Sequence, residues 1–471
     1  MDVSAVLNEV NDFVWGPVML APLVGTGIFL TARLRFLPWL NLGYAIRMIL
    51  RGKNHHTGDI TPFQSLMTAL AATVGTGNIV GVATAMVLGG PGALVWMWIS
   101  AAFGLSTKYA ESVLAVKYRE TNSVGEMAGG PMYAMKNGIQ NKFVGRTMAA
   151  LFAFFAVGAS FGIGHMTQAN SISAAFNASF AIPTWATGAV LTGIALAVLI
   201  RGIHSIGKVS SVIVPGMAAF YFIVSIIVII VNFDAVPAGV AEMFRMAFSL
   251  DSVAGGVGGS IVASMLTSMR WGVARGVFSN EAGLGSAPIA AAAARTDHAS
   301  RQGYVNMTGT FFDTMIICVL TGLVISSSGC LGAVDLETGK LVSGAQLTIL
   351  AFSSVFGEYA KIIVSVSLAL FAFSTILGWE YYGEKSLEYL CKSRAVIYGY
   401  RVIFSLTTFV GATTTLDVVW NFSDTMNGLM AIPNLLCLLI LSRDVARECF
   451  QYQRDVVEPE RRGIEVDCQT V

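Results

Sequence analysis

Charged side chains are scarce in this sequence. Asp, Glu, Lys and Arg make up 12% of its 471 residues, whereas apolar residues make up 55%. A soluble chain of this length carries about twice that charged fraction, so the composition argues against an ordinary soluble protein. The formal net charge is only +1, and we therefore expect neither a nucleic-acid partner nor an acidic one.

Paired cysteines and several common enzyme motifs are also missing. The six cysteines have no paired spacing, which argues against a disulfide or metal framework. The sequence contains no P-loop, HExxH or CxxC motif, so we expect no enzymatic activity and no organic cofactor. No basic segment precedes the first apolar stretch, and the N-terminus therefore does not resemble a cleaved signal peptide.

Long apolar runs are abundant instead. A helix needs about 20 apolar residues to cross a bilayer. Eleven segments meet that requirement, and we predict an all-α integral membrane protein with eleven transmembrane helices. Their approximate bounds are 15–34, 63–88, 92–116, 146–178, 181–200, 208–232, 254–277, 304–327, 358–390, 397–416 and 425–442.

Basic residues gather in alternate loops between these segments. The loops after the odd-numbered segments hold most of the Lys and Arg, whereas the other loops are nearly free of them. Because cytoplasmic loops carry the excess of positive charge, this alternation supports the count of eleven. It places the N-terminus outside and the C-terminus in the cytoplasm. Residues 1–60 then form an interfacial segment, a first helix and a cytoplasmic loop, residues 61–442 a ten-helix core, and residues 443–471 a charged cytoplasmic tail.

The second segment contains a polar, glycine-rich interruption. Inside the apolar run 63–88 stands the sequence Gly75-Thr76-Gly77-Asn78. In lipid, backbone groups without helical partners must face protein or a water-filled cavity, and broken helices hold substrates and ions in transporters. Freed N–H groups at the start of a half-helix can bind a carboxylate, and freed carbonyls can coordinate Na⁺. The alternative is that these small residues only pack two helices together.

The seventh segment is also rich in small residues. It holds several glycines, with Ser268 and Gly272 further on, and we expect a second break near its middle. It lies five segments after the first broken helix, the interval at which inverted repeats of five helices place their two broken helices. Packing of small residues is again the alternative. Glu281 follows this segment, where it can pair with a basic residue as a cytoplasmic gate or belong to a capped turn.

Two other apolar segments carry polar groups suited to a binding site. Ser374 and Thr375 are adjacent hydroxyls in the ninth segment, and Trp379 lies one turn beyond Thr375 on the same helical face. Such hydroxyls can complete a site for an alkali cation, or they can bond back to the preceding turn of their own helix. Gln168, close to His165 in the fourth segment, indicates either a polar-lined cavity or a hydrogen bond between helices.

Together these stretches resemble the alanine/glycine:cation symporter family. The resemblance extends from the second to the ninth segment, and the eleven segments fit the family as well. It implies a LeuT-type fold of the APC superfamily, with two inverted repeats of five helices and one additional N-terminal helix. The matching stretches are ATVGTGNIVG (72–81), GGPGALVWMWIS (89–100), AGGPMY (128–133), RGVFSNEAGLGSAP (275–288) and FSTILGWEY (373–381).

The resemblance also implies roles for individual residues. The backbone of Thr76 and Gly77 would bind the substrate carboxylate, while Gln168 and Trp379 would shape the pocket. The sodium site would combine carbonyl oxygens with two hydroxyls. The candidate substrate-binding residues are Thr76, Gly77, Asn78, Gln168, Ser268, Gly272, Thr375 and Trp379, and the candidate sodium ligands are Ala71, Val74, Ser374 and Thr375.

The expected function is therefore transport. We expect a protein of the bacterial or archaeal cytoplasmic (inner) membrane, in contact with membrane lipid, that carries alanine or glycine into the cell with Na⁺ by alternating access. A proton-coupled symporter of the same fold is the first alternative, because His165 and the acidic residues on the inner side leave proton coupling open. A channel or a membrane-embedded enzyme is a further alternative, against which the missing enzyme motifs argue.

Overall fold

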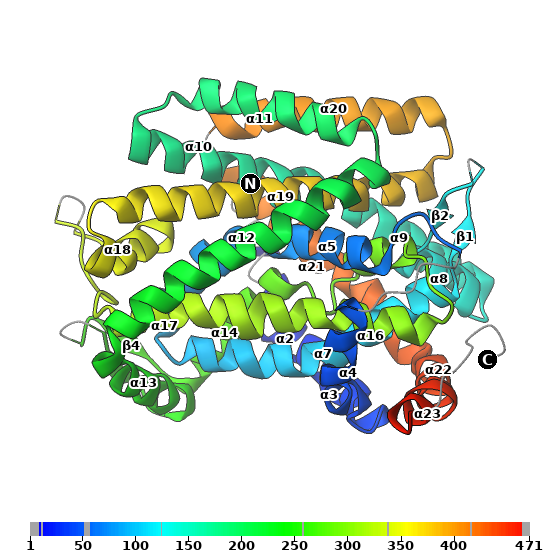
Figure 1. The fold of residues 1–471 in the computed structure, drawn as a ribbon, viewed down its shortest axis with the longest axis horizontal. Helices are drawn as coiled ribbons and strands as arrows, with labels where there is room; N and C mark the ends of the chain where they lie inside the picture. The colour runs from blue at the N-terminus through cyan, green and yellow to red at the C-terminus, as the bar shows by residue number, and fades with distance from the viewer. Residues whose placement is uncertain are drawn as a thin grey trace.

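Helices account for nearly all of the fold, and the long ones run roughly along the long axis of the molecule (Figure 1). The computed structural model describes residues 9–10, 13–50, 57–123, 125–256, 259–336, 339–414 and 417–463. The N-terminal part contains α2 (Pro17–Arg33), α3 (Leu37–Leu40) and α4 (Leu42–Leu50). The C-terminal part contains α22 (Ser442–Tyr452) and α23 (Glu458–Arg461).

Between these ends lie two sets of helices with the same order of elements. The first set is α5 (Pro62–Thr73), α6 (Val82–Gly89), α7 (Ala93–Lys117), α8 (Pro131–Gly138), α9 (Lys142–Phe161) continued by α10 (Thr167–Phe180), α11 (Thr184–Leu199) and α12 (Ile203–Val231). The second set is α14 (Met265–Asn280), α15 (Pro288–Ala292), α16 (Ala299–Thr310) continued by α17 (Val319–Ser327), α18 (Gly344–Phe356), α19 (Tyr359–Leu390), α20 (Arg394–Thr413) and α21 (Asp417–Ile440). Each set starts with an interrupted helix and has one short helix between its second and third long helices.

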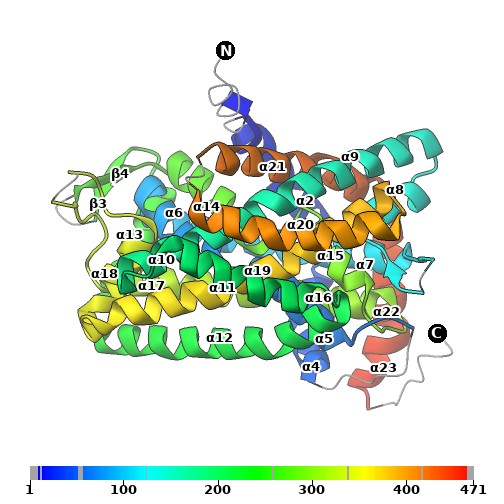
Figure 2. The same ribbon diagram turned by 90° about the horizontal axis from the view of Figure 1, so that it is seen from above.

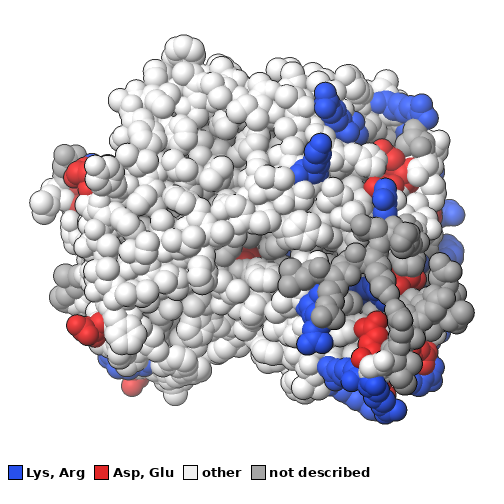
Figure 3. All heavy atoms as spheres, viewed as in Figure 1, with Lys and Arg blue, Asp and Glu red and all other residues white. Residues whose placement is uncertain are grey.

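The length and composition of these helices are those of a multi-pass membrane protein. Six of the described helical stretches are long and apolar enough to cross a bilayer, or seven if the bent pair α5–α6 is one span. The helices α2 and α11 are apolar but shorter, so the count of eleven spans stays a prediction. Charged atoms gather at the two ends of the molecule, and the surface between the ends is almost free of them (Figure 3).

One end of the molecule carries most of the basic residues. The loops predicted to be cytoplasmic meet at the end that holds β1 (Glu120–Thr121), β2 (Met127–Ala128), α8 and α22, while α13 (Val236–Phe248) and α18 lie at the opposite end (Figures 1 and 2). Blue atoms dominate the first of these ends in the view of Figure 3. This one-sided distribution matches the alternation of basic loops along the sequence.

The first interrupted helix breaks where the sequence predicts. Thr61 caps the start of α5 in a reciprocal arrangement with Gln64. The backbone leaves helical geometry at Val74, whose φ is −78° and ψ 91°. It re-enters a helix through the π-helical turn Gly77–Gly81, and the two halves are bent by 50°.

The prediction for the seventh segment, 254–277, is wrong in its first half. There β3 (Val253–Gly255) and β4 (Ile261–Ala263) form an antiparallel hairpin, and α14 starts only after its cap Ser264. Gly256, with a φ of 72°, takes a backbone conformation that favours glycine and directs the chain into the turn. No break occurs in the middle of α14. The interruption follows it at residues 281–287. Glu281 caps the end of α14 with a left-handed backbone, as the capped-turn alternative describes, and a gating role stays a prediction.

The tail is more ordered than its charge suggests. Residues 442–461 form α22, a π-helical turn and α23, and α22 packs against α7 and α16. Tyr452 on this tail lies within 3.2 Å of the Tyr44 hydroxyl. Val445, Cys449 and Tyr452 of α22 are fully buried, so the described part of the tail packs against the helical core. Residues 464–471 lie outside the described residues.

Candidate functional site

The break after α5 exposes backbone groups to side chains from other helices. The Gly75 N–H donates to the Asn78 side-chain oxygen at 2.9 Å. The Thr76 N–H donates to the Gln168 side-chain oxygen at 3.4 Å, which is longer than a usual hydrogen bond. A carboxylate forms stronger, charge-assisted bonds with such groups, so it can displace Gln168 from the Thr76 N–H.

A small cavity lies beside this break. Its volume is about 20 Å³, close to the space that one water molecule needs. Five of the eight candidate substrate-binding residues line it, which are Thr76, Gly77, Gln168, Thr375 and Trp379. The other lining residues are Ala72, Thr73, Gly75, Ile163, Phe278, Glu281 and Asn427. The cavity is therefore a pocket with a largely polar lining beside two interrupted helices.

The four candidate sodium ligands lie together next to the cavity. The Ser374 hydroxyl is 3.3 Å from the Ala71 carbonyl oxygen, and the Thr375 hydroxyl is 3.5 Å from the Val74 carbonyl oxygen. Both hydroxyls also donate to the Phe371 carbonyl of their own helix, at 2.8 and 3.1 Å. The back-bonds to the preceding turn are the shorter ones, as the packing alternative expects, and the sodium site stays a prediction. The oxygens at the end of a half-helix are suited to bind Na⁺.

Close approach of three chain segments depends on two glycines. A Cβ atom at Gly75 would lie 2.4 Å from the Thr375 hydroxyl oxygen, and a Cβ atom at Gly164 would lie 2.1 Å from the Trp379 ring. Trp379 is only 3% exposed, and it lines the cavity together with Glu281. Glycine at both positions therefore lets α19 approach the broken helix and the α9–α10 helix at the cavity.

Comparisons with known proteins identify the family. The sequence model of the Sodium:alanine symporter family matches residues 1–465. This chain belongs to that family. The sodium/alanine symporter AgcS of Methanococcus maripaludis is 49% identical over 450 residues, which cover 95% of this chain and 97% of that protein. An uncharacterized transporter of Haemophilus influenzae is 43% identical over 454 residues, which cover 96% of each chain.

The fold agrees with a LeuT-like structural neighbour. The solved structure of MhsT in complex with L-phenylalanine matches with a TM-score of 0.55 at 12% identity, covering 84% of this chain and 99% of that chain. Membership of the sodium:alanine symporter family confirms the resemblance and makes the protein a membrane transporter and not an enzyme. Na⁺ is the coupling ion and alanine the substrate that the family name implies.

One sequence match to an enzyme motif has no enzymatic context in this transporter. Residues 158–162 read GASFG, which fits the GxSxG pattern of serine hydrolases. That motif works on a sharp turn between a strand and a helix. Here it runs from α9 into a π-helical turn, and the Ser160 hydroxyl donates to the Val157 carbonyl at 2.7 Å.

Three candidate substrate-binding residues of the symporter do not line the cavity. The Ser268 hydroxyl donates to the Gly89 carbonyl at 2.6 Å, and a Cβ atom at Gly272 would lie 2.2 Å from the Ala93 carbonyl oxygen. Both therefore pack α14 against α6 and α7. Asn78 holds the break in shape through Gly75 and through Asp313, whose carboxylate accepts from the Asn78 amide at 2.7 Å.

Two buried ionisable residues beside the second break, Lys108 and Glu111, were missed by the sequence analysis. The Lys108 ammonium donates to the Asn280 carbonyl at 2.7 Å, and Glu111 accepts from the Gly283 N–H at 3.0 Å. Glu281 has a left-handed φ of 57° and accepts from the Ser286 hydroxyl at 2.6 Å. A signal was available, because ionisable residues inside a membrane helix mark functional sites, and Lys108 and Glu111 both stand in the third apolar segment.

Asn427 of α21 is a further cavity residue without a sequence signal. Its side-chain oxygen is buried and has no hydrogen-bond partner among the described residues. A buried acceptor without a partner costs about 1–3 kcal/mol. A donor that enters the cavity removes this cost, so Asn427 is a candidate substrate contact.

His165 lies away from the cavity lining. Its imidazole is fully buried, 2.7 Å from the Thr408 hydroxyl and 3.2 Å from the Thr407 hydroxyl. It also stacks on Phe404 with ring centroids 3.9 Å apart. These contacts connect α20 to the π-helical turn Gly162–Met166, and they give His165 a packing role.

Proposed function

We propose that this symporter carries alanine or glycine into the cell together with Na⁺ by alternating access. One observation carries the proposal. The freed backbone of the first broken helix, the Trp379 indole and the hydroxyl of Thr375 line one cavity, and the Ala71 and Val74 carbonyls lie next to it. A zwitterion and a cation can thus bind side by side on the same broken helix.

The charged ends of the amino acid would bind opposite kinds of group. We propose that the Thr76 and Gly77 N–H groups at the start of the second half-helix receive the carboxylate. The ammonium group would donate to Glu281 and to the unpartnered oxygen of Asn427. Trp379 would cover the side chain of the substrate and limit its size.

Sodium would couple to the substrate through shared structure. Na⁺ held by Ala71, Val74, Ser374 and Thr375 fixes the end of α5 against α19, and both elements also line the cavity. The first ligand to bind orders the contact between α5 and α19, so the second ligand loses less free energy in ordering it. Coupling of this kind is reciprocal, so alanine should raise the affinity for Na⁺ by the same factor as Na⁺ raises the affinity for alanine.

Two features support alternating access. The two helix sets repeat one order of elements, each beginning with an interrupted helix, as expected for the inverted repeats of transporters. The cavity of about 20 Å³ is too small for alanine, so the walls must move during transport. Residues 61–442 would form this ten-helix core, with residues 1–60 and 443–471 as additions.

Proton coupling is the alternative that remains for the same fold. His165, the residue that first suggested it, packs away from the cavity, whereas Glu281 lines the cavity. Alanine binding to the purified protein should require Na⁺ and disappear when choline replaces it at constant pH. Binding that persists in choline and follows pH would support the proton-coupled alternative.

We expect the pocket to accept only small side chains. Glycine, alanine and serine should compete with labelled alanine for binding, while leucine and phenylalanine should not, because Trp379 and the Gly164 segment leave little space. Trp379→Ala should let leucine compete. Strong competition by leucine in the unchanged protein would contradict this pocket, and a loss of folded protein in the variant without any change in selectivity would make Trp379 a packing residue only.

We also propose that the basic end faces the cytoplasm of the bacterial or archaeal cell. Cysteine introduced at Lys142 should resist an impermeant thiol reagent in intact cells, while cysteine at Lys340, in the opposite loop, should react. The background is a variant without the partly exposed thiols Cys330 and Cys391. Labelling at position 142 from outside, with position 340 protected, would reverse the topology.

A further inference from the structure

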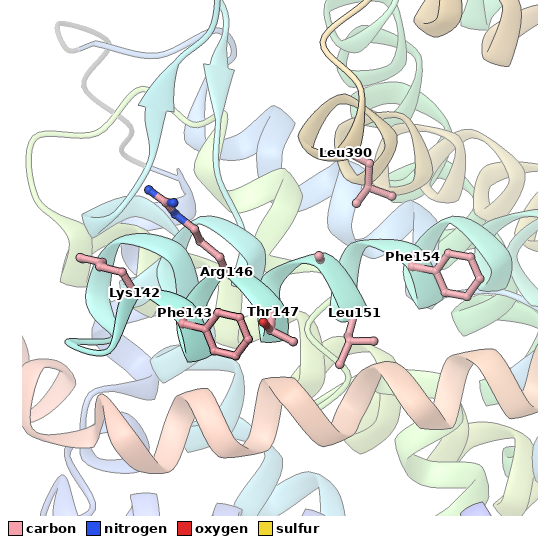
Figure 4. Close-up of a pocket in the computed structure, with 8 residues that line it drawn as sticks. Lys142, Phe143, Arg146, Thr147, Leu151, Phe154 and Leu390 are labelled. Atoms are coloured by element: carbon pink, nitrogen blue, oxygen red, sulfur yellow. The ribbon is translucent and has the colours of Figure 1, made fainter.

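A groove runs along the first turns of α9. Its volume is about 690 Å³, within the range of small-molecule sites. Figure 4 shows that α9 supplies most of its wall, with Leu390 from the end of α19 on the other side. The lining residues are Lys142, Phe143, Arg146, Thr147, Ala150, Leu151, Phe154 and Leu390.

The greater part of the groove is apolar and exposed. Phe143 is 80% exposed, Leu151 47%, Phe154 60% and Leu390 44%. The three α9 residues recur at helical spacing and form one face, while Phe152 on the opposite face is fully buried. In a protein whose apolar belt lies in the membrane, this face meets lipid chains.

The other part of the groove is cationic. Lys142 and Arg146 are four residues apart in the first two turns of α9, so they lie on the same side of the helix. Among the described residues, the one hydrogen-bond acceptor of the Lys142 ammonium is the Asn137 carbonyl, at 3.2 Å. Within the described residues, no salt bridge joins either cation to a carboxylate. The positive end of the helix dipole adds to their field.

We propose that this groove binds one anionic phospholipid. The phosphate would lie between Lys142 and Arg146, and an acyl chain would follow Phe143, Leu151 and Phe154 toward Leu390. Charge complementarity selects this occupant, because basic pockets at the membrane surface bind acidic head groups. Lys142 and Arg146 stand at the start of α9, and this helix runs from the basic end of the protein toward its apolar middle (Figure 2). The two cations therefore lie at the level of the head groups. The site is separate from the transport cavity.

Thermal stability of the purified full-length protein in detergent tests the proposal. Phosphatidylglycerol and phosphatidylcholine with identical chains are titrated, and glycerol phosphate serves as the head group alone. We expect phosphatidylglycerol to stabilise the protein at about tenfold lower concentration than phosphatidylcholine, and glycerol phosphate to have no effect. K142Q/R146Q should lose this preference, whereas the control R201Q/K208Q, which removes two exposed basic residues outside the groove, should keep it.

A second variant tests the apolar part of the groove without changing its two cations. Leu151→Trp keeps both cations but fills the apolar part, and it should weaken the response to both lipids. The proposal is overturned if the unchanged protein responds equally to the two lipids. It is also overturned if R201Q/K208Q loses the preference as much as K142Q/R146Q does, or if glycerol phosphate alone stabilises the protein fully. A lipid-independent dimer that K142Q/R146Q dissociates would instead assign the groove to a second copy of the chain.

Discussion

Lys108→Met is expected to destabilise the protein strongly. Lys108 is 1% exposed, and its ammonium bonds to the Asn280 carbonyl at the end of α14. Glu281, Glu111 and Asp313 interact electrostatically with this ammonium. Removing one partner from a buried charge cluster costs about 3–5 kcal/mol, because it leaves uncompensated charge in a medium of low dielectric constant. The melting temperature in detergent should fall accordingly.

The same helix provides a matched control. Lys117 at the end of α7 pairs with Glu448 at 2.7 Å, but both side chains are nearly one-fifth exposed. Lys117→Met should therefore cost no more than about 1 kcal/mol. Adding Glu111→Gln to Lys108→Met removes one of the unbalanced charges and should restore part of the stability. Equal effects of the two lysine substitutions, with no recovery in the double variant, would contradict this role of Lys108.

Thr375→Ala should weaken sodium binding about tenfold or more. The change removes one hydroxyl oxygen beside Val74 and keeps a small side chain. A hydrogen-bond-like contact to a charged group is worth about 1.5–3 kcal/mol, and ~1.4 kcal/mol corresponds to one decade in affinity. Alanine binding measured across a sodium series should be weaker at low Na⁺ and should recover at high Na⁺, because the two ligands are linked.

Ser367→Ala is the control for that experiment. Ser367 lies on the same helix and is equally buried, and its one acceptor within the described parts of the chain is the Ile363 carbonyl of its own helix, at 2.8 Å. Its loss should leave the sodium dependence unchanged. If the sodium curves of Thr375→Ala and the unchanged protein superimpose as well, then Thr375 acts only through its back-bond to Phe371 and is not a sodium ligand.

The sequence predicts the first break well and the second one poorly, for a physical reason. At residues 75–78, glycines and a polar amide interrupt a long apolar run, and lipid cannot satisfy the freed backbone. Around Gly256, a short apolar hairpin has the same hydropathy as a helix, so periodicity cannot separate the two. The short helix α18 escaped prediction because it lies in a loop between longer apolar segments.

The candidate site also contains some residues that the sequence predicts and one that it does not. Thr76, Gln168, Thr375 and Trp379 come from three distant parts of the chain, and the family resemblance alone is enough to group them in one pocket, where all four lie. Asn427 has no such signal, because its importance lies in an unpartnered oxygen that only the packing of α21 places at the cavity. A site residue of this kind, which matters only through its tertiary contacts, can be found from the structure but not from the sequence.

The most direct test of sodium-coupled alanine transport is uptake of labelled alanine into proteoliposomes that contain the purified protein. An inward Na⁺ gradient should drive accumulation above the external concentration. Replacing external Na⁺ with choline at constant pH, or collapsing the Na⁺ gradient with an ionophore, should abolish that accumulation. If alanine still accumulates in choline and its accumulation follows an imposed proton gradient, sodium coupling is contradicted. If internal alanine never exceeds the external concentration under any gradient, active transport itself is contradicted.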